Sequence, residues 1–351
     1  MARSPATTTR RRWIDATVDQ LLALLPTSWT IRATGQEGDV TLLSVGDATG
    51  VQGKLKLLTT DRLEPRDTRA LWLPTDAPVL LSADWLSERT REVLRERGAS
   101  YIDRTGNVEI QLDRPGMFIR TSGAVRDPDP KPTNAPSLRG PRAWAMLRTL
   151  IEVDPPYTAG DLATALGVDN GYVSRVLQVL ADELVIERAP RGPVTAAEWE
   201  PLLRMVTANY SLLGANTPTS WVAAAGPSQL VDDLPKLRIG RWAVTGSFVA
   251  SSISPVAAPE MAVIYTEDAE RLAKAARLLP AKVGANVVLA EPYDPIVFER
   301  GTTTNGMRMV SVAQAAIDCL TGPGRMPAEG EALLAWMRRN PKRWRAATLQ
   351  G

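Results

Sequence analysis

The spacing of apolar residues predicts alternating helices and strands over the first 121 residues. Apolar side chains recur at helical intervals from Trp13 to Leu25, and Pro26 ends that pattern. Strand-like runs follow at 29–33, 40–45, 55–58 and 79–82. A charged helix is predicted over 87–97, and two further strands flank the turn 105–107. Residues 10–121 are therefore expected to form an α/β domain with a central sheet.

Residues 122–140 predict a linker. Four prolines alternate there with polar residues, at positions 128, 130, 132 and 136. A packed element does not tolerate that spacing of proline. This is the clearest domain boundary in the chain.

Three helices and a hairpin are predicted between residues 141 and 194. The first helix covers 141–152, and the second covers 159–166, with Thr158 and Asp161 at capping-box spacing. Gly167 ends the second helix because glycine accepts the positive φ of a tight turn. Asp169 or Asn170 caps the third helix, which runs to about Leu180. Residues 184–187 and 192–194 then flank a short hairpin whose tip is expected to carry Arg188 and Arg191.

This stretch resembles the winged helix-turn-helix superfamily of bacterial regulators. The resemblance is carried by the spacing of Ala163, Gly167, Val173 and Val176, and it implies binding to double-stranded DNA. Arginine and glutamine can each form two hydrogen bonds to guanine or adenine, whereas tyrosine and serine suit phosphate. The residues expected to contact DNA are Asn170, Tyr172, Ser174, Arg175 and Gln178 on the third helix, with Arg188 and Arg191 in the wing.

A softer boundary at 213–219 separates the DNA-binding domain, 141–213, from a C-terminal domain, 219–351. Strands are predicted at 242–244, 261–265 and 287–289. Helices are predicted over 268–279, from Ser311 onward and over 329–339, followed by a basic tail. The whole chain is therefore expected to be a multidomain α/β protein.

Composition excludes several kinds of chemistry. The chain has no histidine and a single cysteine, Cys319, so it lacks a histidine general base, an intrachain disulfide and a cysteine-rich zinc site. We expect no metal and no cofactor. No apolar run is long enough to cross a membrane, and Arg10–Arg12 precede no apolar signal segment, which favours a cytoplasmic protein.

Charge is distributed unevenly. The formal net charge is only +2, and positions 139–194 hold six basic residues against seven acidic ones. The predicted DNA-binding region is therefore not strongly basic. We expect the basic tail, Arg10–Arg12 and two lysines of the first domain, Lys54 and Lys56, to contribute phosphate contacts.

The order of parts resembles actinobacterial proteins related to the antitoxins of abortive-infection (type IV) toxin–antitoxin systems. The resemblance rests on the segments 101–108, 171–177, 244–247, 284–287, 291–295 and 321–325. It implies a DNA-binding autoregulator rather than a catalyst. The N-terminal α/β domain is a departure, because the shorter antitoxins lack it.

The two flanking domains resemble enzymes that have lost catalytic residues. The first is similar to a restriction endonuclease, with Asp39 as the first metal-binding acid and Lys56 as the lysine. Lys54 stands where the second acid belongs. The C-terminal domain is similar to a nucleotidyltransferase, with Thr245-Gly246-Ser247 as its turn. Glu260 is the one acid of its metal-binding strand, and Ala262 replaces the second.

These patterns predict a non-catalytic, sequence-specific transcriptional regulator that binds palindromic DNA as a homodimer. Two alternatives remain open at this point. One is a Mg²⁺-dependent nuclease that uses Asp39 and Lys56, and the other is an antitoxin-type partner of a neighbouring gene product.

Overall fold

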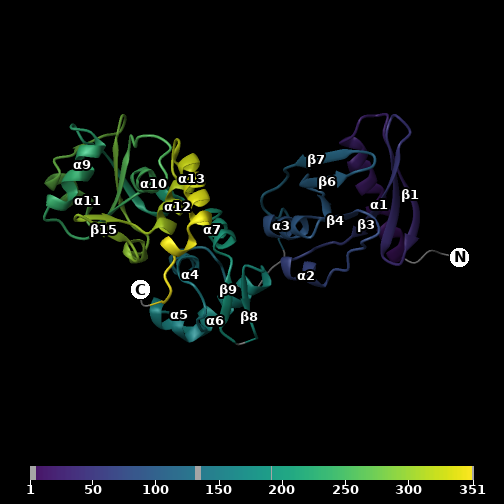
Figure 1. Cartoon of the computed structure of the whole chain (residues 1–351), viewed down its shortest axis with the longest axis horizontal. Coiled ribbons are helices and arrows are strands. Elements are labelled where there is room, and N and C mark those ends of the chain that lie inside the picture. The colour runs from purple at the N-terminus through teal and green to yellow at the C-terminus, as the bar shows by residue number, and fades with distance from the viewer. Residues whose placement is uncertain (1–4, 131–135, 191, 350–351) are drawn as a thin grey trace. The chain divides into compact units, whose positions relative to one another are not determined.

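The computed structural model describes residues 5–130, 136–190 and 192–349, and the chain folds into two compact units. Of the described residues, unit 1 contains those up to 130 together with 182–184, and unit 2 contains 136–181 and those from 185 onward. Both units mix helices and sheets, as the sequence predicts (Figure 1). None of the described helices is long and apolar enough to cross a membrane.

Unit 1 is a seven-stranded sheet with helices on both faces. Its strands follow one another in chain order, and only β3, β4 and β5 run parallel. The elements are α1 (Pro5–Ala23), β1 (Thr30–Glu37), β2 (Val40–Gly46), β3 (Gln52–Thr59), α2 (Pro65–Ala70), β4 (Val79–Ala83), α3 (Glu88–Glu96), β5 (Ser100–Asp103), β6 (Val108–Leu112) and β7 (Met117–Thr121).

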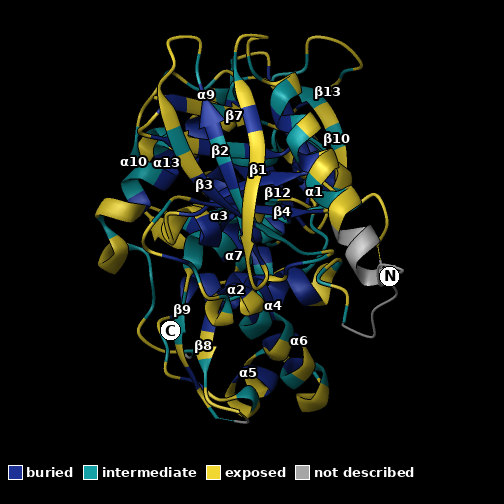
Figure 2. Ribbon diagram, turned by 90° about the vertical axis from the view of Figure 1, so that its right-hand side faces the viewer, coloured by how far each residue is buried: buried dark blue, intermediate teal, exposed yellow. Residues whose placement is uncertain are grey.

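Alternation along the strands builds two separate cores in unit 1. Leu80 and Leu81 are neighbours on β4, so their side chains point to opposite faces of the sheet. Leu80 joins the core that α1 covers, and Leu81 joins the core beside α3. Figure 2 shows the inner strands buried and the edge strand β1 largely exposed. Most of the predicted elements of this unit are present, with β1 and β3 longer than expected.

Unit 2 combines a helical region with a second seven-stranded sheet. The helical region holds α4 (Pro141–Glu152), α5 (Ala159–Leu166), α6 (Asn170–Asp182), β8 (Ile186–Arg188), β9 (Val194–Ala197), α7 (Trp199–Thr207) and α8 (Leu212–Ala215). The sheet region holds β10 (Thr217–Val222), α9 (Pro227–Asp233), β11 (Trp242–Thr245), α10 (Ser247–Ile253), β12 (Ala262–Thr266), α11 (Ala269–Ala275), β13 (Leu279–Pro280), β14 (Val287–Glu291), β15 (Thr302–Thr304), β16 (Met307–Met309), α12 (Val312–Thr321) and α13 (Met326–Arg339). The strand order is β13-β10-β14-β12-β11-β16-β15.

Two predicted boundaries in unit 2 need correction. The helix expected over 268–279 ends at Ala275, because Arg277 adopts a positive φ of 53° and Leu279 pairs in the sheet. The final helix begins at Met326 rather than Glu329, with a proline in its first turn. Local apolar spacing identified both helices but missed the end of the first and the start of the second.

The boundary expected at 213–219 lies inside unit 2, and one hydrophobic core continues across it. Asn216 explains the continuity. Its amide nitrogen donates to the Leu212 carbonyl at 2.7 Å and to the Tyr210 hydroxyl at 3.0 Å, and its oxygen accepts from the Tyr293 backbone at 2.9 Å. Asn216, one of the residues that predicted a boundary, is therefore a buried connection between the two regions.

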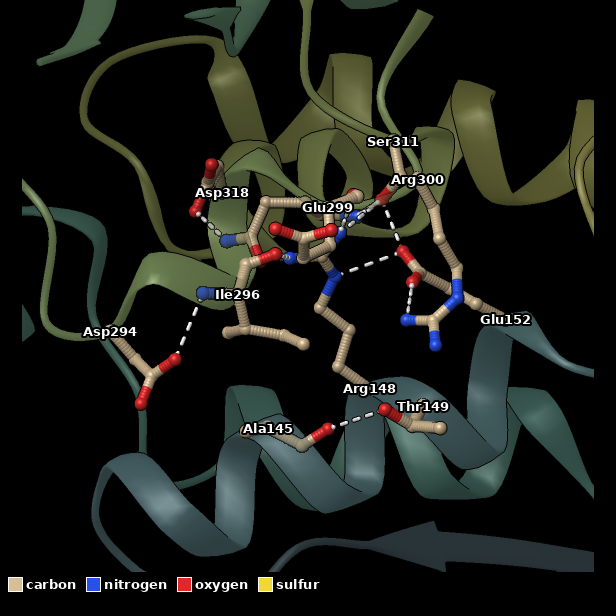
Figure 3. Close-up of polar contacts among 11 residues, drawn as sticks. Ala145, Arg148, Thr149, Glu152, Asp294, Ile296, Glu299, Arg300, Ser311 and Asp318 are labelled. Carbon is tan, nitrogen blue, oxygen red and sulfur yellow. Dashed lines mark hydrogen bonds and ion pairs between the residues drawn. The ribbon is translucent and has the colours of Figure 1, made fainter. Parts of the chain in front are cut away.

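A buried ion pair on α4 fastens the helical region to the sheet region (Figure 3). Arg148 and Glu152 are each 1 % exposed, and Arg148 Nε lies 2.9 Å from Glu152 Oε1. The guanidinium also donates to the carbonyls of Ile296 and Glu299 and, at 3.1 Å, to Ser311 Oγ. Because these acceptors lie beyond residue 290, the pair holds α4 against the sheet region.

Removing one partner of this pair should be costly. Arg148→Ala leaves the Glu152 carboxylate buried without its main donor, so we expect unit 2 to lose about 3–5 kcal/mol of unfolding free energy. Arg204→Ala is the matched control, because its pair with Glu331 is exposed and should contribute less than about 1 kcal/mol. Urea unfolding and hydrogen exchange of α4 measure both variants. Equal losses would show that the buried pair has no special role.

A second buried carboxylate, Asp318 on α12, is surrounded by donors. It accepts from the hydroxyls of Tyr210 at 2.8 Å, Tyr265 at 3.0 Å and Thr245 at 2.6 Å, and from the Gln314 amide at 2.9 Å. Burial outweighs these hydrogen bonds and raises the pKa of Asp318 from 3.8 to about 6. The protonated form is therefore the one that folding favours.

This shift predicts a pH dependence of stability. The contribution of Asp318 is fully present below about pH 4 and is lost as the pH rises through about 6, by roughly 3 kcal/mol. Asp318→Asn keeps the shape but does not titrate, so the stability difference between wild type and variant should change by that amount between pH 3.5 and 7. Urea unfolding across that range measures it. A pH-independent difference would contradict the assignment.

Candidate nucleic-acid interface

Helices α5 and α6 form a helix-turn-helix whose turn is fixed by local hydrogen bonds. The Thr158 hydroxyl accepts from the Asp161 backbone at 3.1 Å, and the Asp161 carboxylate accepts from the Thr158 backbone at 2.7 Å. Gly167 ends α5 with a φ of 63°, a left-handed conformation that disfavours a side chain. The capping box and the glycine turn predicted from sequence are both present.

Helix α6 is amphipathic. Asp169 caps it by accepting a hydrogen bond from the Tyr172 backbone at 2.9 Å. Val173, Val176 and Leu177 are fully buried on its inner face, against the core that α4 also enters. The opposite face is exposed at Asn170, Gly171, Arg175 and Gln178.

The predicted DNA-contacting residues of α6 fall into two groups. Asn170, Arg175 and Gln178 are exposed, so their side chains lie on the outer surface of the helix. Ser174 and Tyr172 are half-buried, and the Tyr172 ring packs against the core. Burial raises the pKa of the Tyr172 phenol, which stays a neutral hydrogen-bonding group.

The hairpin β8–β9 follows α6 as expected, but Arg188 does not lie at its tip. It is the last residue of β8, it is opposite Val194 and half-buried, and its Nε atom is buried with no hydrogen-bond partner among the described residues. The strands cover 186–188 and 194–197 rather than 184–187 and 192–194, which places Arg188 inside the ladder. Arg191, also predicted to contact DNA, lies outside the described residues.

Figure 1 shows α5, α6 and this hairpin gathered at one end of unit 2. The hairpin is tied to the start of α5, because the Val194 nitrogen donates to the Tyr157 carbonyl at 2.9 Å. The helix-turn-helix and the wing are therefore parts of one hydrogen-bonded substructure.

Two exposed arginines that sequence reasoning did not assign lie at the start of α4, and one of them is close to this surface. Arg139 and Arg142 precede and begin α4. The positive charge of Arg142 lowers the pKa of Tyr172, opposing the effect of burial, so the guanidinium lies near the start of α6. The sequence signal was the pair of arginines around Gly140-Pro141 at a helix start.

The basic tail is less available for phosphate contacts than expected. Arg338 pairs with Glu200 at 2.7 Å, and Arg345 is 11 % exposed, paired with Asp154 at 2.7 Å and hydrogen-bonded to the carbonyls of Ile151 and Val153. These two arginines hold the tail against the helical region. Their charges serve folding and are already neutralised by carboxylates.

The lysine of the predicted nuclease motif also forms ion pairs within the fold. Lys56 is 6 % exposed, and its Nζ lies 2.8 Å from Asp76 and 3.3 Å from Glu37. These hydrogen bonds raise the pKa of Lys56 and lower the pKa of Asp76. Lys56 thus acts as the cation between two carboxylates, and neither of them is Asp39. It is not an exposed phosphate contact, whereas Lys54 is exposed.

The described residues contain no group of three or more histidine, cysteine, aspartate or glutamate side chains suited to a metal ion. In unit 1 the motif residue Asp103 is fully buried and accepts from the backbones of Leu86, Thr105 and Asn107. These hydrogen bonds explain why an aspartate occurs in the 101–108 motif. The Asp103 carboxylate holds the turn that follows it, and its oxygens are used by hydrogen bonds within the fold.

The nucleotidyltransferase-like turn of unit 2 is closed by α13. Gly246 has a φ of 65°, and a Cβ built there would lie 2.6 Å from Met326 Cε. The Ser247 hydroxyl donates to the buried Glu329 carboxylate at 2.5 Å. Glu260 is exposed and lies 3.5 Å from Arg325. Side chains of the fold itself thus occupy the turn that would approach a nucleotide.

No protein-family model, curated protein or solved structure matches the chain.

A cleavage assay tests the nuclease alternative. We expect supercoiled plasmid to stay intact with Mg²⁺ or Mn²⁺, because Lys56 already neutralises the two carboxylates nearest to it. Gel electrophoresis of the plasmid measures the outcome. Cleavage that disappears in Asp39→Ala or Lys56→Ala would establish a nuclease and overturn this expectation.

Proposed function

We propose that the protein is a non-catalytic, sequence-specific transcriptional regulator that binds double-stranded DNA through α6 and the hairpin β8–β9. The observation that carries the proposal is the α5–Gly167–α6 turn, which presents one exposed polar helix face beside a hairpin. An α-helix exposed in this way fits into the major groove of B-DNA.

The polar residues of α6 suit readout of bases. Arg175 can donate two hydrogen bonds to guanine, and Asn170 and Gln178 can pair with adenine. Half-buried Ser174 and Tyr172 are placed for phosphate contacts. Sequence preference therefore resides in the exposed face of α6.

Affinity requires further positive charge, because the helical region is nearly neutral. Arg142 supplies it near the start of α6 and Arg188 supplies it in the hairpin, and to these we add the exposed Arg139 and the sequence-predicted Arg191. We assign these arginines to the phosphate backbone. A homodimer places two such surfaces on a palindromic site, in keeping with cytoplasmic gene regulation.

Arg175→Ala should weaken binding to the preferred sequence by about 1–3 kcal/mol, or roughly 5- to 150-fold. The preferred sequence is first selected from random duplexes with the wild-type protein, and affinities follow from fluorescence anisotropy at fixed salt. Arg142→Ala should instead weaken binding to all duplexes by similar factors and reduce the salt slope by about one.

Arg271→Ala is the matched control, since Arg271 is an exposed helical arginine on α11 of the sheet region. It should bind as the wild type does. The recognition-helix assignment fails if Arg175→Ala keeps both wild-type affinity and wild-type preference. The proposed function fails if the wild-type protein selects no sequence at all.

A further inference from the structure

A cavity of about 460 Å³ lies beside the helix-turn-helix of unit 2. Its walls come from the loop before α5, from α5 itself and from residues 347–349, which lie far away in the sequence. That volume is in the range of small-molecule sites in proteins. Nothing in the proposed DNA contact uses it.

Backbone hydrogen bonds fix the walls of the cavity relative to each other. The Asp154 backbone donates to the Ala346 carbonyl at 2.8 Å, and the Ala346 backbone donates to the Glu152 carbonyl at 2.7 Å. Arg345 adds its bonds to the carbonyls of Ile151 and Val153. The tail and the loop are therefore fixed to each other next to the cavity.

The lining indicates the charge of a ligand. Asp154 and Asp161 both line the cavity, but Asp154 is already paired with Arg345 at 2.7 Å, so the negative charge offered to a ligand is that of Asp161. Ala165 and Leu349 supply apolar surface, and Thr164 adds a hydroxyl. One carboxylate together with apolar surface suits a small organic cation, such as an amine on a hydrophobic group.

Tyr157 links the cavity to the DNA-binding elements. It lines the cavity, it is 4 % exposed, and its hydroxyl has no hydrogen-bond partner among the described residues. Its backbone pairs with Val194 at the base of the wing, and the next residue, Thr158, caps α5. A ligand against Tyr157 thus contacts a residue that joins the hairpin to the start of α5.

We propose that this cavity binds a small organic cation and that the bound cation changes the affinity of the wing and α6 for DNA. The regulatory half of the proposal rests on the proposed function, whereas the binding half does not. Binding energy reaches the wing through the Tyr157–Val194 bridge, and the coupling is reciprocal between cation and DNA.

The first experiment uses the full chain without DNA. Isothermal titration calorimetry compares 2-phenylethylamine with its neutral analogue 2-phenylethanol and the anionic 3-phenylpropionate. We expect the amine to bind at least about fivefold more tightly than either analogue, as one carboxylate contact near the surface provides. Asp161→Asn should remove most of that preference, and Asp232→Asn, an exposed acid on α9, should not.

A blocking variant separates the cavity from the rest of the surface. Ala165→Phe places a ring in the cavity and should abolish amine binding, whereas Ala275→Phe on the exposed side of α11 should leave it unchanged. Circular dichroism checks that each variant folds. The proposed site is wrong if the three probes bind equally, if none binds, or if the amine still binds to folded Ala165→Phe.

The second experiment measures operator affinity with and without saturating amine. We expect the two affinities to differ at least threefold in the wild type and to agree in Ala165→Phe. Amine binding with no change in operator affinity overturns the regulatory half. Failure of the protein to select any DNA overturns the proposed function alone, because amine binding is measured independently.

Discussion

The fold of unit 2 depends on the ion pair between Arg148 and Glu152. Two charges that are 1 % exposed can be stable only if nearly every donor and acceptor around them is satisfied. Here the further partners come from Ile296, Glu299 and Ser311, so the buried charges are not fully hydrogen-bonded until the sheet region is in place. The helix that supports α5 and α6 therefore has one defined position. A rigid support of this kind reduces the conformational entropy that α6 would lose on binding a partner.

The features that the sequence predicted well are those decided by neighbours along the chain. Thr158, Asp161 and Gly167 act within one turn of a helix, and Ser311 caps α12 through the backbone of Gln314. Strand alternation in unit 1 is likewise local, since each side chain simply takes the next face of the sheet. These local features can be predicted without knowing which other elements pack against the helix or strand.

The features that were missed are decided by residues distant in sequence. Lys56 pairs with Asp76, which comes from a loop 20 positions later. Arg338 and Arg345 read as a free basic tail, yet their partners Glu200 and Asp154 lie more than 100 positions earlier. Asn216 looked like part of a domain boundary because small polar residues are also common there. The exposed face of α6 was predicted in outline, but the place of Arg188 within its strand depended on hairpin register.

The return of the tail to the loop after α4 has a consequence for synthesis. Arg345 bonds to the Val153 carbonyl, a residue 192 positions earlier. During translation, the helices that carry the proposed recognition surface emerge long before the segment that closes the loop beside them. Contacts of such long sequence separation form slowly, since the intervening chain must first be ordered. The nascent chain can thus hold an incomplete helix-turn-helix on the ribosome, and its maturation follows the emergence of residue 346.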